Sequence, residues 1–344
     1  MKKGFTLVEL LAVIVILAVI LIIAIPHVLK VIEQSRINAF ESDAKMILNA
    51  IRMKKTSNID FNYTVIDETN IKELLNINDV NYKSITITQK DEDPYIIIVG
   101  KNKWANLVVS GTTNNIFIHQ DLVLWLDASN TASYPKSGST WYDISGNENS
   151  GVFVNNPTFD NGAIMFNGVD DYIRIESSND FNTGINGTFT YSAWIKSSDY
   201  SVPQTIISRT NPCSNPGHFN IFINNNKVHF SFYSNLDARG ITHSSSNSIL
   251  ENDQWHHIVW TKQWGQLGVK LYVDGVLHLV SNDSDIRGTT YSRPVFIGAR
   301  NRNPGVCESD PSPSRFFNGM ISDIRVYNRI LSEDEIKLLY ESTK

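Results

Sequence analysis

The residues best able to perform acid–base chemistry are scattered along the sequence. A glycoside hydrolase needs two carboxylates across one bond, and a strand brings them to one face only when they are two residues apart. No predicted strand carries such a pair, because Glu333, Asp334 and Glu335 lie at the start of a predicted helix, where acids suit its dipole. His256 and His257 are adjacent and therefore point to opposite faces of a strand. With no HExxH zinc motif and no nucleophile elbow, the sequence predicts a protein that is not an enzyme.

One carboxylate, Glu9, interrupts an apolar run from Phe5 to Ile25. A carboxylate near the centre of a membrane costs about 2.5 to 3.5 kcal/mol on insertion scales, so it is seldom kept without a partner. Glu9 is therefore a candidate assembly residue that pairs with a neighbouring molecule. The alternative is that it reaches the nearby interface of a plain single-pass anchor.

The apolar run determines the expected topology. It has about 20 residues, the length that a helix needs to cross a membrane. Lys2 and Lys3 precede it, so the first residues are expected in the cytoplasm and everything after Pro26 on the other side. Apolar residues three or four apart then continue a helical period to about residue 55. Pro26 should kink or loosen this helix where its two halves meet.

The segment Lys2-Lys3-Gly4-Phe5-Thr6-Leu7-Val8-Glu9, followed by the apolar run, resembles the signal of type IV prepilins and pseudopilins. Pro26 lies where that family has a helix-loosening proline. The resemblance implies that a separate prepilin peptidase cuts between Gly4 and Phe5 and methylates the new amine. It also implies that Glu9 pairs with the Phe5 amine of another pilin subunit as a filament grows.

The middle of the chain changes to short alternating or apolar runs. These predict an antiparallel meander, preceded by a short helix over ETNIKELLNI. Pilin headpieces have this kind of sheet on the exposed half of the long helix, so we expect the first region to end near His119. The runs are YKSITITQ, PYIIIVG, ANLVVSG and NNIFIH.

From Leu122 onward, strand-like runs recur roughly every 8 to 15 residues without long helices, which predicts a two-sheet sandwich. Asn224 to Asn226 and Asp274-Gly275 are predicted hairpin turns. Ser332 and Glu335 predict a capping box that starts a last helix. The runs are LVLWLDA, AIMFNG, DYIRIE, FTYSAWIKS, TIISRT, FNIFINN, KVHFSFY, HHIVWTK, VKLYVDG, VFIGAR and ISDIRVYN.

Six pieces in order resemble the laminin G-like, concanavalin A-like jelly rolls, which implies this fold for nearly all of residues 122 to 344. The fold hosts glycan binders, protein binders, spacers and some hydrolases, so the resemblance is weaker evidence for function. The pieces are DISGN at 143–147, FNGVDDYI at 166–173, FTYSAWI at 189–195, WHHIV at 255–259, LYVDG at 271–275 and NGMISDIRVY at 318–327.

The same resemblance implies calcium as a cofactor, held by oxygen ligands from loops. Asp143, Asn147, Asp170 and Asp171 are the candidate ligands, and Asp143 and Asp171 are the two that we select. The alternative is that these side chains form turns by bonding their own backbone.

Two cysteines and a tryptophan lie in turn-rich segments. Cys213 and Cys307 lie in Pro- and Asn-rich loops, which in an exported domain favours one disulfide, with two free thiols as the alternative. Trp264, in the polar turn QWGQLG, is a candidate sugar-stacking residue, although packing at a hairpin tip is equally consistent. Trp194 lies in an apolar strand run and is expected in the core.

The sequence thus predicts an α+β pilin-like region with a long membrane-spanning helix, followed by an all-β two-sheet jelly-roll sandwich. We expect a leader at 1–4, the helix at 5–55, a small antiparallel sheet at 56–120 and the jelly roll at 121–344. The net charge of −5 excludes nucleic acid as the primary partner.

The predicted function is a pilin-like surface protein, a minor or adhesive filament subunit that displays a non-catalytic jelly roll for an extracellular glycan or protein. It would be anchored by a single pass, with its C-terminal domain outside the cytoplasm, at the cell surface or on a pilus. The alternatives are a pseudopilin of a secretion or DNA-uptake system, and a membrane-tethered carbohydrate-active enzyme.

Overall fold

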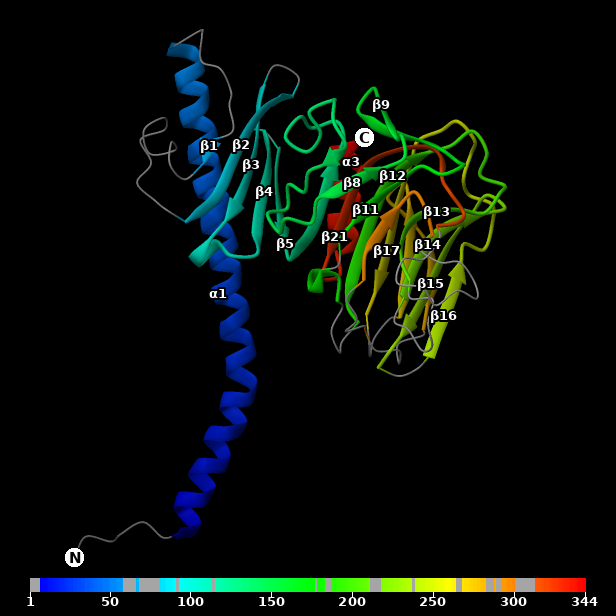
Figure 1. Cartoon of the computed structure of the whole chain (residues 1–344). Helices are drawn as coiled ribbons and strands as arrows, with labels where there is room; N and C mark the ends of the chain where they lie inside the picture. Colours follow the sequence, from blue (N-terminus) through cyan, green and yellow to red (C-terminus); the bar gives the residue numbers. More distant parts are fainter. Residues whose placement is uncertain are drawn as a thin grey trace, which may run out of the picture. The chain divides into compact units, whose positions relative to one another are not determined.

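The chain forms two compact units, Met1–Ile118 and His119–Lys344, each with its own hydrophobic core (Figure 1). The computed structural model describes residues 7–57, 66–67, 81–90, 93–112, 115–176, 178–182, 187–210, 218–236, 239–263, 268–282, 288, 293–300 and 313–344. The predicted fold class, a long helix with a small sheet followed by an all-β sandwich, is confirmed. The short helix predicted over residues 68–77 lies outside the described residues.

Helix α1 (Leu7–Ser57) is continuous through Pro26, and Glu9 lies in its first turns. The large apolar side chains described between Leu7 and Ile32 are 46–83% exposed. This half is apolar and long enough to cross a membrane. An apolar surface of this size needs a membrane or other helices around it.

The second half of α1 packs on a small antiparallel sheet. Its buried face consists of Phe40, Ala44, Ile47, Leu48 and Ile51, each at most 1% exposed, which confirms the predicted helical period. Among the described residues the sheet has the order β1-β2-β3-β4-β5. Its strands are β1 (Ile66–Asp67), β2 (Tyr82–Lys90), β3 (Asp93–Gly100), β4 (Leu107–Thr112) and β5 (Asn115–Gln120), with a 3-10 turn, η1, at Asn102–Trp104.

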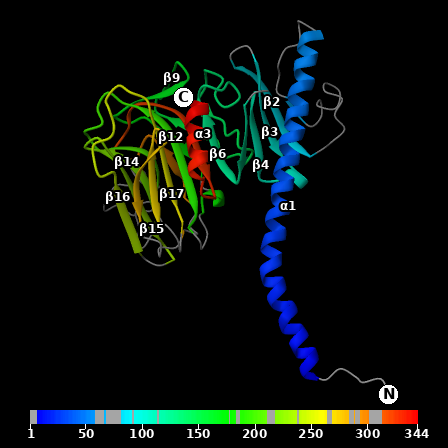
Figure 2. The same cartoon turned by 180° about the vertical axis from the view of Figure 1, so that it is seen from behind.

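The second unit is a sandwich of two sheets, and one of them is covered on its outer face by helix α3 (Glu333–Thr343), as Figure 2 shows. We call it the α3-covered sheet. Its described strands follow the order β19-β18-β17-β12-β21-β10-β9, with β6 also paired to β21. They are β6 (Leu122–Asp127), β9 (Thr158–Asp160), β10 (Ala163–Asn167), β12 (Phe189–Lys196), β17 (His256–Lys262), β18 (Val269–Val273), β19 (Val276–Ser281) and β21 (Asn318–Tyr327).

The other sheet has no Asp or Glu in any of its described strands, and we call it the acid-free sheet. Its order is β16-β15-β14-β13-β20-β11-β8-β7. The strands are β7 (Thr140–Trp141), β8 (Gly151–Val154), β11 (Tyr172–Ile175), β13 (Gln204–Arg209), β14 (His218–Asn224), β15 (Lys227–Ser234), β16 (Arg239–Ser244) and β20 (Val295–Ile297). A 3-10 turn, η2, lies at Asn179–Phe181.

Local signals place the turns and the last helix where the sequence predicts them. Asn225 and Asn226 have φ angles of 52° and 56° in the β14–β15 turn. Asp274 and Gly275 have φ angles of 52° and 76° in the β18–β19 turn, as a tight hairpin requires. The capping box is also present, since Ser332 Oγ accepts from the Glu335 N–H and Glu335 accepts from the Ser332 N–H.

Six strands are not among the predicted runs: β1, β7, β8, β9, β16 and β19, the last of which follows the predicted hairpin turn at Asp274-Gly275. The first four have two to four residues, too few for an alternating pattern to be recognised. The fifth, β16, reads RGITHS and contains one large apolar residue. Its pairing with β15 makes it a strand, so tertiary context overrides a weak local pattern.

Candidate functional site

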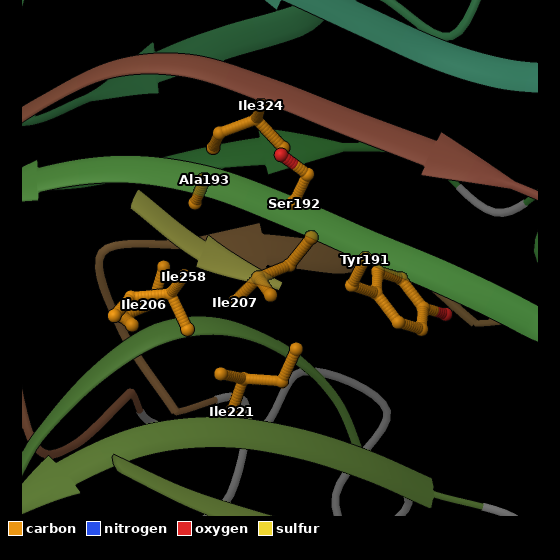
Figure 3. A pocket seen from close by; sticks show the side chains of 8 residues that line it. All are labelled: Tyr191, Ser192, Ala193, Ile206, Ile207, Ile221, Ile258 and Ile324. Atoms are coloured by element: carbon orange, nitrogen blue, oxygen red, sulfur yellow. The ribbon is translucent and has the colours of Figure 1, made fainter. Parts of the chain in front are cut away.

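The space between the two sheets is too small for a ligand. Figure 3 shows a cavity there, into which isoleucines of both sheets point. Its volume is about 10 Å³, room for at most one water molecule. This cavity is therefore not a ligand site, and the outer faces of the described sheets are the next candidates. The cavity is lined by Tyr191, Ser192, Ala193, Ile206, Ile207, Ile221, Ile258 and Ile324.

A row of polar side chains crosses the outer face of the acid-free sheet. Ser208 on β13 is the register partner of Asn220 on β14, Asn220 of Ser231 on β15, and Ser231 of Thr242 on β16. Because Phe219 lies in the core and strand residues alternate between faces, Asn220 and its partners point outward. We call these four residues the polar row.

The centre of the polar row holds an unused hydrogen-bond acceptor. Asn220 is 2% exposed, and its Oδ1 atom has no hydrogen-bond partner among the described residues. Thr205, the register partner of Phe222 on β14, is fully buried. Its Oγ1 atom also has no hydrogen-bond partner among the described residues. A buried polar atom without a partner costs about 1 to 3 kcal/mol, so both atoms lower the stability of the free protein, and both lie beneath the surface.

Stacked rings flank the polar row on both sides. On one side the rings of Phe222 and His229 lie 4.7 Å apart at 12°. On the other side His218 and Tyr233 lie 5.6 Å apart at 16°. Gly240 lies opposite Tyr233, where a Cβ atom would come within 2.7 Å of the ring, so a glycine here leaves room for it. All four rings are half-buried, so part of each reaches the surface.

Cations surround the Phe222–His229 pair. The Arg315 guanidinium lies 5.5 Å from the centroid of the Phe222 ring, and Lys227 Nζ donates to the Ser246 carbonyl at 3.0 Å. Burial lowers the pKa of His229, and the charges of Lys227 and Arg315 lower it further. His229 is therefore mostly neutral at physiological pH, and the positive charge at this end comes from Arg315 and Lys227.

The outer face of the α3-covered sheet is closed by packing. Trp194 stacks on Tyr340 of α3 at 5.6 Å, and its Nε1 donates to Thr343 Oγ1 at 2.8 Å. Trp194 is 7% exposed, so it is buried as expected, but against the helix rather than between the two sheets. Ile336 and Leu339 of α3 are also buried. This packing leaves Trp194 unavailable as a sugar-stacking platform.

The two adjacent histidines of β17 face opposite sides, as predicted. His256 Nδ1 lies 2.9 Å from Asp274 Oδ2, while its Nε2 accepts from the Glu251 N–H at 2.9 Å, so both ring nitrogens are occupied. His257 Nε2 lies 2.7 Å from Ser192 Oγ, and burial lowers the pKa of His257 to about 3. Because this Ser–His pair is buried, it has no access to a substrate.

One pair of carboxylates could not be predicted from the sequence, because its two members lie on different strands. Asp127 on β6 is the register partner of Asp323 on β21. Arg325 binds both oxygens of Asp323, whereas Asp127 accepts from the Ser129 N–H and Oγ. Burial, and then the charge of Asp323, raise the pKa of Asp127 to about 6. Asp323 is 6% exposed, and Arg325 neutralises its charge. The two aspartates therefore belong to a buried polar network.

The two aspartates selected as calcium ligands bind backbone groups in turns. Asp143 accepts from the backbone N–H of Trp125 and of Asn149, and burial raises its pKa. Asp171 is 3% exposed and accepts from the Asn167 N–H. In the part of the chain that is described, no three His, Cys, Asp or Glu side chains are grouped to hold a metal. Calcium binding therefore stays a prediction.

Five residues selected from the sequence lie outside the described residues. They are the cleavage-site residues Gly4 and Phe5, the cysteines Cys213 and Cys307, and the candidate stacking residue Trp264. The disulfide and the stacking role stay predictions. The polar row was missed because its members become neighbours only through strand pairing, which local patterns do not reveal.

Comparison with known families agrees with this architecture at both ends of the chain. Residues 1–25 match the prokaryotic N-terminal methylation motif, and residues 167–337 match the concanavalin A-like lectin/glucanases superfamily. The chain joins a segment similar to the methylation motif to a segment similar to concanavalin A-like domains. The predicted resemblance is thus confirmed. The methylation motif and the exposed apolar half of α1 together support a membrane-anchored, surface-exposed protein. The superfamily contains lectins and glucanases, so membership alone does not distinguish binding from hydrolysis.

No curated protein matches the chain. Among solved structures, the botulinum neurotoxin serotype D binding domain is 18% identical, with a TM-score of 0.45 over 64% of this chain and 52% of that one. The serotype D ligand-binding domain in complex with N-acetylneuraminic acid is 17% identical, with a TM-score of 0.47 over 64% and 51%. The chain thus spans about half the length of these domains, and likenesses this remote carry no argument about its ligand.

Proposed function

We propose that the chain is a type IV pilin-like surface protein, a minor or adhesive filament subunit that displays its concanavalin A-like sandwich as a non-catalytic binding module. The observation that carries this proposal is the division of α1. Its first half is apolar and exposed from Leu7 to Ile32, while its second half is buried under a small sheet. Following a methylation motif, such a helix is suited first to a membrane and then to a filament core.

Processing would create the assembly contact. A prepilin peptidase would cut between Gly4 and Phe5 and leave a methylated amine on Phe5. That amine would pair with Glu9 of an adjacent pilin subunit, because two opposite charges in an apolar setting offset each other's desolvation. Lys2 and Lys3 would hold the leader in the cytoplasm, and the sandwich would then lie outside.

The described geometry favours binding over hydrolysis. A glycosidase needs two accessible carboxylates, one to donate a proton and one to act as base or nucleophile. Asp323 is neutralised by Arg325, and both lie in the buried network of the α3-covered sheet. In contrast, the described strands of the acid-free sheet carry hydroxyls, an amide and stacked rings but no carboxylate. Such groups suit recognition of a sugar by hydrogen bonds and apolar contact.

Electron microscopy of gold-labelled, epitope-tagged protein tests the filament assignment. Because the sandwich is bulky for a subunit repeated at every helical step, we expect sparse label or label at filament tips. Uniform dense label along filaments would contradict a minor role, and label confined to the cell envelope would support a pseudopilin instead.

A charge variant makes this test specific to assembly. Glu9→Gln removes the proposed partner of the Phe5 amine and should reduce labelled filaments at least tenfold, as expected when one partner of a desolvated ion pair is lost, at about 3 kcal/mol or more. Glu41→Gln is the matched control on the same helix. Its exposed pair with Lys45 contributes under about 1 kcal/mol, so labelling should not change. Equal effects of both substitutions would contradict the assembly role of Glu9.

A further inference from the structure

The acid-free sheet has a charge opposite in sign to that of the whole protein. The chain carries a net charge of −5. The eight described strands of this sheet nevertheless contain no acid, and Lys227 on β15 and the neighbouring Arg315 place positive charge at its outer face. A surface of this kind attracts anionic ligands.

The cations at the outer face differ in whether a carboxylate neutralises them. Arg174 pairs with Glu176 at 3.0 Å. Arg315 is exposed, and no described carboxylate pairs with it. The same holds for Lys227, which donates to the Ser246 carbonyl. The charges of Arg315 and Lys227, which no described carboxylate compensates, therefore lie beside Phe222 and His229.

That end combines three kinds of contact in one place. The Phe222–His229 pair offers an apolar surface to the C–H side of a sugar ring. Ser231 and Thr242 of the polar row offer hydroxyl groups that reach the surface. The Arg315 guanidinium, beside the Phe222 ring, offers a planar fork that matches a carboxylate. A carboxylated sugar carries all three complementary features.

We propose that this end of the polar row binds an acidic sugar, a glycan unit with a ring carboxylate, and that Arg315 and Lys227 are its charge partners. The proposal rests on the proposed glycan-binding function and narrows it to one ligand class. A neutral sugar would contact the same rings and polar atoms but would leave the charge of Arg315 uncompensated. Acidic sugars should therefore be preferred, and salt should weaken that preference.

The test compares two ligands that differ in one group. D-glucuronate and D-glucose, conjugated to albumin at equal density, are measured by surface plasmon resonance against the full chain in detergent. Because Arg315 is exposed, its pair with a carboxylate is partly screened by solvent, and we expect the glucuronate conjugate to bind about two- to fivefold more tightly at low salt. Equal binding of the two conjugates would overturn the inference and leave the glycan-binding function standing.

Substitutions test whether Arg315 causes the preference for glucuronate over glucose. Arg315→Ala should remove the preference for glucuronate, and Arg315→Lys should retain part of it, because lysine keeps the charge but not the fork. Arg174→Ala is the matched control on the same face and should retain the full preference, since Glu176 already neutralises Arg174. A preference that survives Arg315→Ala would overturn the assignment. Binding of neither conjugate, nor of any member of a wider panel including N-acetylneuraminic acid, would contradict the proposed glycan-binding function itself.

Discussion

The outer faces of the two sheets of the sandwich differ in how they are packed. The α3-covered sheet has its outer face packed against a helix, with Trp194 stacked on Tyr340 and an Arg325–Asp323 ion pair buried beside it. The acid-free sheet presents half-buried rings and a polar row, with an amide oxygen that lacks a described partner. Each sheet also buries polar atoms without a described partner, such as Trp260 Nε1 in the first and Asn220 Oδ1 in the second, so the two faces differ in their cover by α3 and in the Arg325–Asp323 pair.

This difference separates groups that stabilise the fold from groups that can bind a ligand. A satisfied buried network contributes specificity and stability, and its loss should unfold the domain. An unsatisfied group lowers the stability of the free protein and can recover that cost on binding. Substitutions on the α3-covered sheet should therefore change stability, and substitutions on the acid-free face should change affinity.

The largest effect is expected at the interface between the α3-covered sheet and α3. Trp194→Ala removes a buried ring and its hydrogen bond to Thr343, and should lower the free energy of unfolding by about 3 to 5 kcal/mol. Urea unfolding followed by circular dichroism measures it. Val276→Ala on β19 is the control, because Val276 is 59% exposed and should change stability by under about 0.5 kcal/mol. A loss under 1 kcal/mol for Trp194→Ala would show that α3 does not seal this face.

The next effect is a pH dependence from Asp127. Its pKa is about 6 in the folded protein, above the ordinary value of 3.8, so the folded state holds the proton more tightly than the unfolded state. The protonated carboxyl therefore adds to the free energy of unfolding. This contribution is fully present below pH 4 and is lost as the pH rises to 6, at up to about 1.4 kcal/mol per pH unit. Asp127→Asn should therefore stabilise the protein relative to wild type at pH 7 and not at pH 4. Thermal unfolding of both proteins across this range gives the difference, and a constant offset would contradict the raised pKa.

A smaller effect, on affinity, is expected on the acid-free face. Phe222→Ala removes one ring of the stacked pair beside the polar row and should weaken glycan binding about tenfold, since a lost aromatic contact is worth about 0.5 to 1.5 kcal/mol beyond its area. Tyr142→Ala is the comparison, because Tyr142 is 49% exposed and does not belong to the polar row or its flanking rings. If both substitutions left affinity unchanged while the protein still bound its glycan, the site would lie elsewhere.

The smallest effect concerns the start of α3. Ser332→Ala deletes the capping-box oxygen that accepts from the Glu335 N–H and should cost about 1 kcal/mol. Ser332→Thr should restore most of it, because threonine is also a good N-cap. Thermal unfolding of the two variants distinguishes loss of the cap from a general effect of substitution at this position.

Features set by local chemistry could be predicted from the sequence. The spacing of Phe40, Ala44 and Ile47 gives the buried face of α1, and Asp274-Gly275 gives a hairpin turn. These depend on residues within a few positions of each other. Cleavage at Gly4 and the calcium ligands are equally local predictions, and they still need experiments.

Features set by long-range pairing could not be predicted. Ser208 and Asn220 face each other because β13 pairs with β14, and β13 also pairs with β20, which lies far along the chain. Asp127 and Asp323 meet in the same way across β6 and β21. Strand runs can be recognised in a sequence, but their order and register in a sheet depend on the packing of the whole domain.

The measurement that tests the central claim most directly is the mass of the mature N-terminus after expression with a prepilin peptidase, for the wild type and for Gly4→Val. We predict a wild-type mass that begins with N-methylated Phe5 and a variant that keeps its leader. A wild-type protein that retains Met1 would contradict the pilin pathway and leave a single-pass anchor that displays the sandwich.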